Sequence, residues 1–514
     1  MRNKIQLITY ANSLGKDLKE LDLILEKYFK REIKGVHILP FYPSSADRGF
    51  SPLTHLEVDK SFGDWDDIKK ISHKRELVAD LVVNHISSES KEFQDFLKNG
   101  QRSKFKNFFI TTEKFSSRLD LMKIDKKIRK LLTFFKGPVN FARRIDLVFH
   151  LQGVNKFVLQ KIYRPRLGSP FELFEFKGGQ KKAVWCTFSR NQVDFDINSA
   201  GVRRKIKKWI ESLAKNGVKL LRLDAVGYSA KRRGTTSFMI PQTYNFIKWL
   251  GKISHKNGME TLPEIHNHYS MQVKLAKTNG VDYVYDFCLP LLVLHSIFKR
   301  DSVHLKSWIE IRPENQITTL DTHDGIGVID VEGLLNKKES KDLAEHIFRN
   351  GGNATMRASG INSDNVDVYQ INTTYYSALK ENDRDYLISR AIQFFVPGIP
   401  QVYYVGLLAG KNDEELLKET GNGRDVMRHY YSLSEIEESL ENPVVEKLMK
   451  LMRFRNEYSA FNGKFEIQET DKHKLILSWR KGRGYCKLEV NFWKKEGRIE
   501  FWDLNEGETK EIFL

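Results

Sequence analysis

Short apolar runs bounded by turn-forming residues recur along the chain, and helical patterns lie between many of them. We interpret eight of these runs as strands: residues 5–10, 35–42, 76–83, 217–224, 258–264, 281–287, 316–321 and 399–405. Residues 200–217 and 243–258 instead repeat apolar side chains at helical spacing. Strands that alternate with helices favour a parallel sheet, and eight of them predict an α/β fold closed into a (β/α)8 TIM barrel.

Two connections between predicted strands are too long for a simple helical crossover. One runs from Asp80 to Asp224, and the other from Asp321 to Val402. Barrel loops tolerate such insertions, which commonly form the walls that face a substrate. Beyond residue 460, apolar and polar residues alternate with glycine-bearing turns, which predicts a small antiparallel β domain. The expected division is a barrel over 1–82, 199–325 and 381–460, insertions over 83–198 and 326–380, and a C-terminal β domain over 461–514.

Three acidic residues, Asp224, Glu264 and Asp324, lie at or just beyond the ends of separate predicted strands. The carboxyl ends of barrel strands are where this architecture gathers its chemistry. Taken alone, any one of these acids would more often cap a helix or pair with an arginine. Together, and with His85 and His323 also near strand ends, they indicate a site that cleaves glycosidic bonds, which requires a set of carboxylates.

A glycoside cleavage that retains configuration needs a nucleophilic carboxylate and an acid/base carboxyl group about 5–5.5 Å apart. Asp224 and Glu264 end neighbouring strands and can meet this requirement. An acid/base at Glu264 needs a raised pKa, whereas a nucleophile at Asp224 must stay ionised. Arg222, two residues earlier on the same strand face, is the cation that we expect to pair with Asp224.

The formal net charge of +18 raises the question of a nucleic-acid partner. The lysines and arginines are spread along the chain among 66 acids, and no nucleic-acid recognition motif is present. We therefore expect a solvated basic surface and no nucleic-acid partner. The segment 123–144 combines basic residues with apolar ones at helical spacing, so it could contact a membrane or a partner. Packing against its own domain is the more common role for such a helix, and we expect no membrane partner.

The N-terminal residues do not resemble a signal peptide, and no run of about 18 apolar residues predicts a membrane-spanning helix. The three cysteines, Cys186, Cys288 and Cys486, cannot all pair and have no metal-ligand spacing. These features favour a reduced, cytoplasmic protein.

Four short strings resemble the signature regions of the α-amylase superfamily (glycoside hydrolase family 13): DLVVNH (80–85), RLDAVGY (222–228), LPEIH (262–266) and LDTHD (320–324). Longer strings resemble its sucrose phosphorylase branch, among them GVHILPFYPSSADRGF (35–50), IYRPR (162–166), VDVYQINTTYYSAL (366–379) and GRDVMRHYY (423–431). The resemblance covers nearly the full chain and is weakest in 112–160 and in the last 50 residues.

The resemblance implies a double displacement. Asp224 would be the nucleophile that forms a β-glucosyl-enzyme, Glu264 would protonate the leaving fructosyl oxygen and then activate phosphate, and Asp324 would hold glucose hydroxyls. It implies a glucose subsite completed by Asp47, Phe50, His85, Arg222, His323 and Arg424. It implies an acceptor side formed by Arg166, Phe188, Gln192, Tyr228, Asp367, Tyr369 and Gln370, with a loop over 362–369 that exchanges between donor- and phosphate-binding states.

The implied activity is the reversible phosphorolysis of sucrose to α-glucose 1-phosphate and fructose, with sucrose or a related α-glucoside and inorganic phosphate as partners. The basic stretch 112–160 is longer than in the phosphorylases it resembles, so the acceptor stays open. Sucrose 6-phosphate, glucosylglycerol and glucosylglycerate are alternative donors. An α-glucosidase, a transglucosidase and a catalytically inactive binding protein are alternative functions. Members of the branch often form dimers, so a homodimer is a further expectation.

We expect no organic cofactor, since covalent glucosyl chemistry needs none. Asn84 and His85 could suggest a calcium site in an amylase-like frame, but the chain lacks the compact acidic loop that calcium prefers. We therefore expect no metal.

Overall fold

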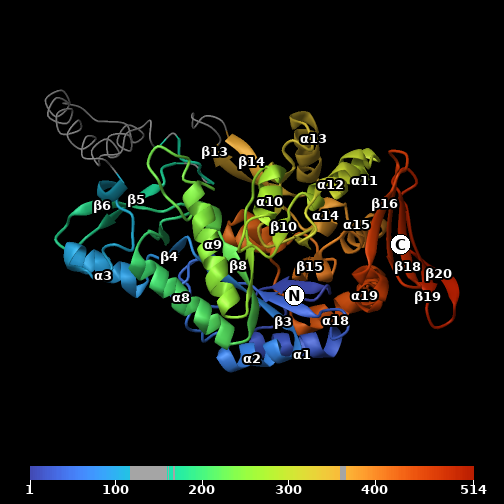
Figure 1. Cartoon of the computed structure of the whole chain (residues 1–514), viewed down its shortest axis with the longest axis horizontal. Coiled ribbons are helices and arrows are strands. Elements are labelled where there is room, and N and C mark those ends of the chain that lie inside the picture. Colours follow the sequence, from blue (N-terminus) through green and yellow to red (C-terminus); the bar gives the residue numbers. More distant parts are fainter. Residues whose placement is uncertain (116–158, 160, 166–167, 359–365) are drawn as a thin grey trace.

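The computed structural model describes residues 1–115, 159, 161–165, 168–358 and 366–514, without the side chains of 356–358, 366 and 367. An eight-stranded parallel sheet lies at its centre, in the order β10-β11-β15-β1-β2-β3-β8-β9 (Figure 1). The strands are β1 (Gln6–Thr9), β2 (Gly35–Ile38), β3 (Glu76–Val82), β8 (Val218–Asp224), β9 (Glu260–Pro263), β10 (Val284–Asp286), β11 (Gln316–Thr318) and β15 (Ile399–Tyr403). The two end strands meet where the N–H of Tyr283 donates to the carbonyl oxygen of Thr261 at 3.1 Å. The TIM-barrel prediction is confirmed.

The inside of the barrel is layered. An apolar layer takes side chains from six strands: Val78, Leu220, Leu262, Tyr285, Ile317 and Ile399. Successive residues of a strand point to opposite faces, so Arg222 and Asp224 project on the same side as Leu220, progressively nearer the carboxyl end. Asp80 stands above Val78 for the same reason, and it is paired with Arg222 in the parallel register of β3 and β8. The fold thus places ionic groups directly above an apolar floor.

Amphipathic helices cover the outside of the barrel. Helix α8 shows the pattern, because its buried residues Val202, Ile206, Trp209, Ile210 and Leu213 form one stripe. The surrounding helices are α1 (Leu18–Tyr28), α2 (Trp65–Lys74), α8 (Ala200–Lys215), α9 (Pro241–Lys256), α10 (Tyr269–Ala276), α11 (Leu289–Lys299), α12 (Val303–Ile311), α15 (Asp383–Phe395), α18 (Leu433–Glu441) and α19 (Pro443–Glu457).

The long connection after β3 contains short elements that lie beside the carboxyl end of the barrel. They are β4 (His85–Ser87), α3 (Lys91–Asn99), α4 (Thr112–Phe115), β5 (Phe171–Glu175), β6 (Lys181–Trp185) and β7 (Gln192–Asp194). β4 pairs antiparallel with β7, and His85 faces Asp194 in that register. The basic segment 123–144 lies outside the described residues, so its role stays a prediction.

The connection after β11 forms a second small layer on the barrel. It contains β12 (Ile326–Gly327), α13 (Lys337–Phe348), β13 (Asn353–Ala358) and β14 (Val366–Asn372), and its strands are ordered β12-β14-β13. A short helix, α14 (Tyr375–Ala378), precedes β15 in the chain, and two more, α16 (Tyr404–Leu407) and α17 (Glu414–Thr420), follow it. This layer and the layer after β3 bound the mouth of the barrel.

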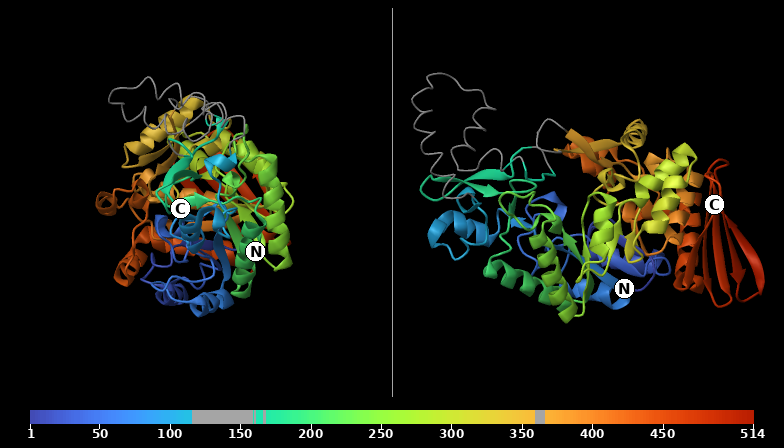
Figure 2. Two further views of the ribbon diagram at one scale, coloured as in Figure 1. Left: turned by 90° about the vertical axis from the view of Figure 1, so that its left-hand side faces the viewer. Right: turned by 45° about the horizontal axis from the view of Figure 1, so that its top comes forward.

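The C-terminal residues form a five-stranded antiparallel sheet in sequential order, as predicted. Its strands are β16 (Lys464–Gln468), β17 (Lys474–Lys481), β18 (Gly484–Asn491), β19 (Glu496–Asp503) and β20 (Glu508–Phe513). The sheet lies at the opposite end of the molecule from the layer after β3 (Figure 1, Figure 2). The buried indole of Trp479 links it to the barrel, because its Nε1–H donates to the carbonyl oxygen of Phe395 at the end of α15 at 2.7 Å.

All three cysteines are buried and carry free thiols. Within the part of the chain that the structure describes, no helix combines the length and apolar character needed to cross a membrane.

Replacing Trp479 by Phe removes the indole donor and leaves the Phe395 carbonyl buried without its partner. We expect a loss of about 1–3 kcal/mol of stability, seen as a lower melting temperature in calorimetry. Trp493→Phe is the matched control, because Trp493 is 60% exposed. Equal melting temperatures for the two variants would show that the Trp479 hydrogen bond does not hold the sheet.

Candidate active site

A cavity opens at the carboxyl end of the barrel strands, and the three strand-end acids all line it. The predicted site residues found in its wall are Asp47, Phe50, His85, Phe188, Gln192, Asp224, Tyr228, Glu264, His323, Asp324, Tyr369, Gln370 and Arg424. Arg222 lies beneath them. Arg166 and the side chain of Asp367 are outside the described residues, so their roles stay predictions.

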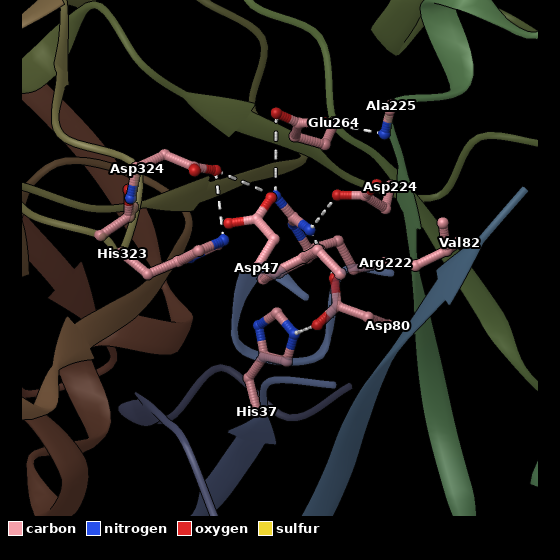
Figure 3. Close-up of polar contacts among 12 residues, drawn as sticks. His37, Asp47, Asp80, Val82, Arg222, Asp224, Ala225, Glu264, His323 and Asp324 are labelled. Atoms are coloured by element: carbon pink, nitrogen blue, oxygen red, sulfur yellow. Dashed lines mark hydrogen bonds and ion pairs between the residues drawn. The ribbon is translucent and has the colours of Figure 1, made fainter. Parts of the chain in front are cut away.

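The guanidinium of Arg222 is the centre of the site (Figure 3). Its Nη1 lies 2.9 Å from Asp224 Oδ1 and in closer contact with Asp80 Oδ1. Its Nη2 lies 3.5 Å from Asp324 Oδ2 and 3.7 Å from Glu264 Oε1. Arg222 is 2% exposed, and charges attract strongly at such depth. One buried cation thus holds four carboxylates together.

Local backbone geometry fixes Asp224 and Glu264 relative to each other. Asp224 is the last residue of β8, and Ala225 follows it with a left-handed φ of 49°. This turn directs the N–H of Ala225 to Glu264 Oε2, at 2.9 Å. The N–H of Glu264 donates in turn to the carbonyl oxygen of Leu223, at 3.2 Å. The carboxyl of Glu264 is therefore tied to the strand that ends in Asp224.

The carboxyl groups around Arg222 differ in acidity. Burial raises the pKa of Asp224 well above its usual range, and the charges of Glu264, Asp80 and Asp324 add to this effect while Arg222 opposes it. Burial also acts to raise the pKa of Asp324, but His323, Arg424 and Arg222 outweigh it, so this pKa is lowered. The sequence-based prediction is that Arg222 keeps Asp224 ionised. The contact exists, but Arg222 divides its charge among several acids.

Asp324 is held from two sides. Arg424 Nη1 lies 3.0 Å from its Oδ1, and His323 Nε2 lies 3.2 Å from its Oδ2. The ring of Phe50 stacks in parallel on His323 with centroids 4.9 Å apart. The carbonyl oxygen of Phe50 is 2.8 Å from His85 Nε2. An aromatic face, a carboxylate and an arginine at one end of a cavity suit the apolar face and vicinal hydroxyls of a sugar.

The loop that carries Asp47 is strained. Asp47 and Arg48 both have positive φ, 55° and 47°, a conformation that costs energy for residues other than glycine. Arg48 is turned away from the cavity and lies between the rings of Tyr10 and Tyr430, 4.3 and 4.4 Å from their centroids. These contacts hold the loop so that Asp47 faces the cavity.

The opposite wall of the cavity is aromatic and polar. Tyr228 contacts Phe188 and Phe238, with ring centroids 5.3 and 4.7 Å apart. Strand β14 contributes Tyr369 and Gln370. The cavity wall also contains residues that were not predicted from the sequence: Pro165, Ala225, Phe238, Ile265, His266 and Thr355.

His266 is the most consequential residue that was missed. Its Nε2 lies 3.6 Å from Glu264 Oε1, and its Nδ1 lies 2.9 Å from Asp330 Oδ2. Burial acts to lower the pKa of His266, but Asp330 and Glu264 outweigh it, so the pKa is raised. The signal was present in the sequence, because His266 follows Glu264 by two residues in LPEIH. His268, by contrast, caps α10 and does not line the cavity.

Two groups of side chains in and near the cavity were considered as metal-binding sites. Glu264, His266 and Asp324 place one ligand atom each within 4.8 Å of one another, so they could hold an ion. At Asn84, where a calcium site was considered, the ammonium of Lys231 lies 2.6 Å from Asn84 Oδ1 and 2.5 Å from Asp194 Oδ2. These oxygens therefore already have a buried cation as their partner.

Comparison with known proteins places this geometry in a family. The model of the α-amylase catalytic domain matches residues 10–137. The chain is 43% identical over 502 residues to the sucrose phosphorylase of Agrobacterium vitis, with 96% of each chain covered. It is 40% identical over 514 residues to the glucosylglycerol phosphorylase of Marinobacter adhaerens, covering 100% of this chain and 99% of that protein. The crystal structure of sucrose 6F-phosphate phosphorylase from Thermoanaerobacter thermosaccharolyticum superposes with a TM-score of 0.89 at 41% identity, covering 100% and 98% of the two chains.

The chain belongs to the sucrose phosphorylase branch of the α-amylase superfamily. As a member of this phosphorylase family it is an enzyme of the glycosyltransferase class. The family resemblance stated from the sequence motifs is confirmed. The relatives include phosphorylases of three different donors at about the same identity, so membership alone does not decide the donor.

Replacing Lys231 by Met leaves Asn84 and the carboxylate of Asp194 buried without their cation. Removing one partner of a buried ion pair costs about 3–5 kcal/mol, so we expect a clear drop in melting temperature. Activity should fall as well, because Asp194 joins β7 to β4, which carries His85. Lys219→Met on the exposed face of β8 is the control. Equal melting temperatures for the two variants would show that the contacts of Lys231 with Asn84 and Asp194 do not stabilise the fold.

Proposed function

We propose that the protein is a sucrose phosphorylase that converts sucrose and phosphate reversibly to α-glucose 1-phosphate and fructose. The observation that carries the proposal is the convergence of Asp224, Glu264 and Asp324 on Arg222 at the base of one cavity. A nucleophile, an acid/base and a group that holds the sugar are what a retaining displacement requires. Buried free thiols also fit a reducing compartment, and we propose the cytoplasm.

In the first half-reaction Asp224 attacks the anomeric carbon of glucose, and the bond to the fructosyl oxygen breaks. Glu264 gives its proton to that oxygen. The Ala225 N–H fixes Glu264 Oε2, which leaves Oε1 facing Arg222 and His266. The product is a β-glucosyl ester on Asp224, and the ionised Asp324 stabilises the positive charge that develops on the sugar ring.

In the second half-reaction phosphate replaces fructose. Glu264, now a carboxylate, takes a proton from phosphate as the phosphate oxygen attacks the glucosyl ester, and Asp224 leaves as a carboxylate. The second inversion gives the α-anomer. Phosphate is an anion, so its binding calls for a cationic side chain on the acceptor side. Arg166 remains a proposed phosphate ligand, and movement of the loop 362–369 remains a proposed way to keep Asp367 from repelling phosphate.

The acceptor wall favours a neutral leaving group. Among the residues that the structure describes, this wall presents Phe188, Tyr228, Phe238, Tyr369 and Gln370. The cationic side chains of the described cavity already have acidic partners, Arg424 with Asp324 and His266 with Asp330. A fructose 6-phosphate or glycerate group would have to rely on Arg166, outside the described residues, to offset its charge. Fructose, and glycerol as the second candidate, need only hydrogen bonds and apolar contact.

Glucosylglycerol is the second candidate donor. The glucosylglycerol phosphorylase of Marinobacter adhaerens aligns with the whole of this chain at 40% identity, and glycerol shares the neutral, polyhydroxylated character of fructose. Sucrose is preferred because the motifs IYRPR and VDVYQ resemble those of sucrose phosphorylases. A homodimer remains a further prediction.

A donor screen tests the proposal. Sucrose, glucosylglycerol, sucrose 6-phosphate and glucosylglycerate are each incubated with inorganic phosphate, and glucose 1-phosphate is measured. We expect the highest kcat/KM with sucrose, and no glucose 1-phosphate unless phosphate is supplied. The Asp224→Asn control should lose turnover with every donor. A kcat/KM at least tenfold higher for another donor, or glucose release at the same rate without phosphate, would contradict the proposal.

The pH dependence of kcat/KM tests the state of Asp224. Its raised pKa places the acid limb of the profile above the value of about 3.9 that is usual for aspartate. Asp80→Asn removes a negative charge that raises the pKa of Asp224. It also removes the carboxylate that competes with Asp224 for Arg222 Nη1. Removing a negative neighbour favours the ionised form, so the acid limb should move to lower pH. A limb that stays in place or moves to higher pH would refute this coupling.

A further inference from the structure

Three helices bring two histidines and a glutamate together away from the catalytic cavity. His295 belongs to α11, His304 to α12 and Glu339 to α13. His304 Nε2 lies 3.3 Å from Glu339 Oε1, and His295 Nε2 lies 4.0 Å from the same oxygen. One ligand atom from each residue lies within 4.8 Å of the other two. None of the three lines the catalytic cavity.

The glutamate is oriented before any ligand binds. Glu339 is the third residue of α13, and its Oε2 accepts a hydrogen bond from the N–H of Asn336 at 2.9 Å. The side chain of Asn336 accepts from the N–H of Glu339 in return, which completes a capping box. The cap uses only one carboxylate oxygen. Oε1 is thereby held toward both imidazoles.

His295 is a buried imidazole without a hydrogen bond among the described residues. The residue is 3% exposed, and its Nδ1 has no hydrogen-bond partner among the described residues. Its Nε2 is 4.0 Å from Glu339 Oε1, which is longer than a hydrogen bond. A simple ion pair between His304 and Glu339 accounts for the 3.3 Å contact, but among the described residues it leaves the buried imidazole of His295 with an edge-on ring contact to His304 and no hydrogen bond. A ligand shared by all three groups accounts for both.

We propose that His295, His304 and Glu339 bind one zinc ion, with water as the fourth ligand. Imidazole and carboxylate ligands suit zinc, whereas calcium and magnesium prefer sites made of oxygen alone. Zinc–ligand bonds of about 2.0–2.1 Å in a tetrahedron place neighbouring ligand atoms about 3.3 Å apart. His304 and Glu339 already have this separation. Bringing His295 Nε2 closer to Glu339 Oε1 by roughly 0.7 Å gives this pair the same separation.

The position of the site gives the ion a structural role. Helices α11 and α12 belong to the barrel, whereas α13 belongs to the layer after β11, whose strand β14 carries Tyr369 and Gln370. The aromatic contact between Phe298 and His346, with centroids 4.3 Å apart, is the neighbouring link between α11 and α13. Zinc would fasten this layer to the barrel and so steady one wall of the catalytic cavity.

The test is a zinc titration of the full-length protein after removal of metal with a chelator. Binding is measured by competition with a chromophoric chelator, and the melting temperature is recorded with and without zinc. The wild type should bind one tight equivalent and melt at a higher temperature with zinc, because the ion binds the folded state. His304→Gln and Glu339→Gln should bind that equivalent at least tenfold more weakly and show no zinc-dependent rise. Gln at position 339 preserves the capping box, so the folded state is retained.

Two control variants locate the ion. His346→Gln changes a histidine of the same helix that is outside the cluster, and should keep the tight equivalent. Glu264→Gln disables the other set of metal-capable residues, in the catalytic cavity, and should keep it too. The proposal is overturned if the wild type binds zinc no more tightly than His304→Gln. It is equally overturned if the tight equivalent is lost in Glu264→Gln and kept in His304→Gln.

Discussion

The catalytic end of the barrel depends on one buried guanidinium. Arg222 contacts Asp80, Asp224 and Asp324 and lies 3.7 Å from Glu264. Without a cation at this position, so many carboxylates could not remain ionised away from water. Its position follows from two features of β structure: the parallel register of β3 and β8 sets Asp80 opposite Arg222, and the period of two sets Asp224 above it. The apolar layer below supports this arrangement.

The shared cation also explains why similar groups have different acidities. Asp324 has Arg424 and His323 as further partners, and its pKa is lowered. Among the described residues, Asp224 has only Arg222 as a cationic partner and shares it with other acids, and burial raises its pKa. Environments that move the pKa values of neighbouring carboxyls apart allow them to take different parts in one reaction.

Much of this architecture could be predicted from the sequence, because strand and helix periods are local. All eight barrel strands were identified, although most are shorter than the apolar runs; β2 ends at Ile38, where the run continues to Tyr42. The strand-end acids could be predicted as site residues because the carboxyl ends of barrel strands are where catalytic groups lie. Arg222 was assigned to Asp224, its near neighbour, whereas its contact with Asp80 joins residues 142 positions apart. Phe238 and Lys231 gain their roles only from tertiary packing, which no local pattern reveals, whereas the proximity of His266 to Glu264 could be read from LPEIH.

The central claim is that Asp224 carries the glucosyl group. The Glu264→Gln variant with α-glucosyl fluoride tests it directly, because fluoride leaves without a proton donor while the lost base slows release of the glucosyl-enzyme. After acid quenching and digestion, mass spectrometry should find the mass of one glucosyl group on the peptide that contains Asp224. A glucosyl group on a different residue, or turnover of the fluoride with no adduct at Asp224, would contradict the account.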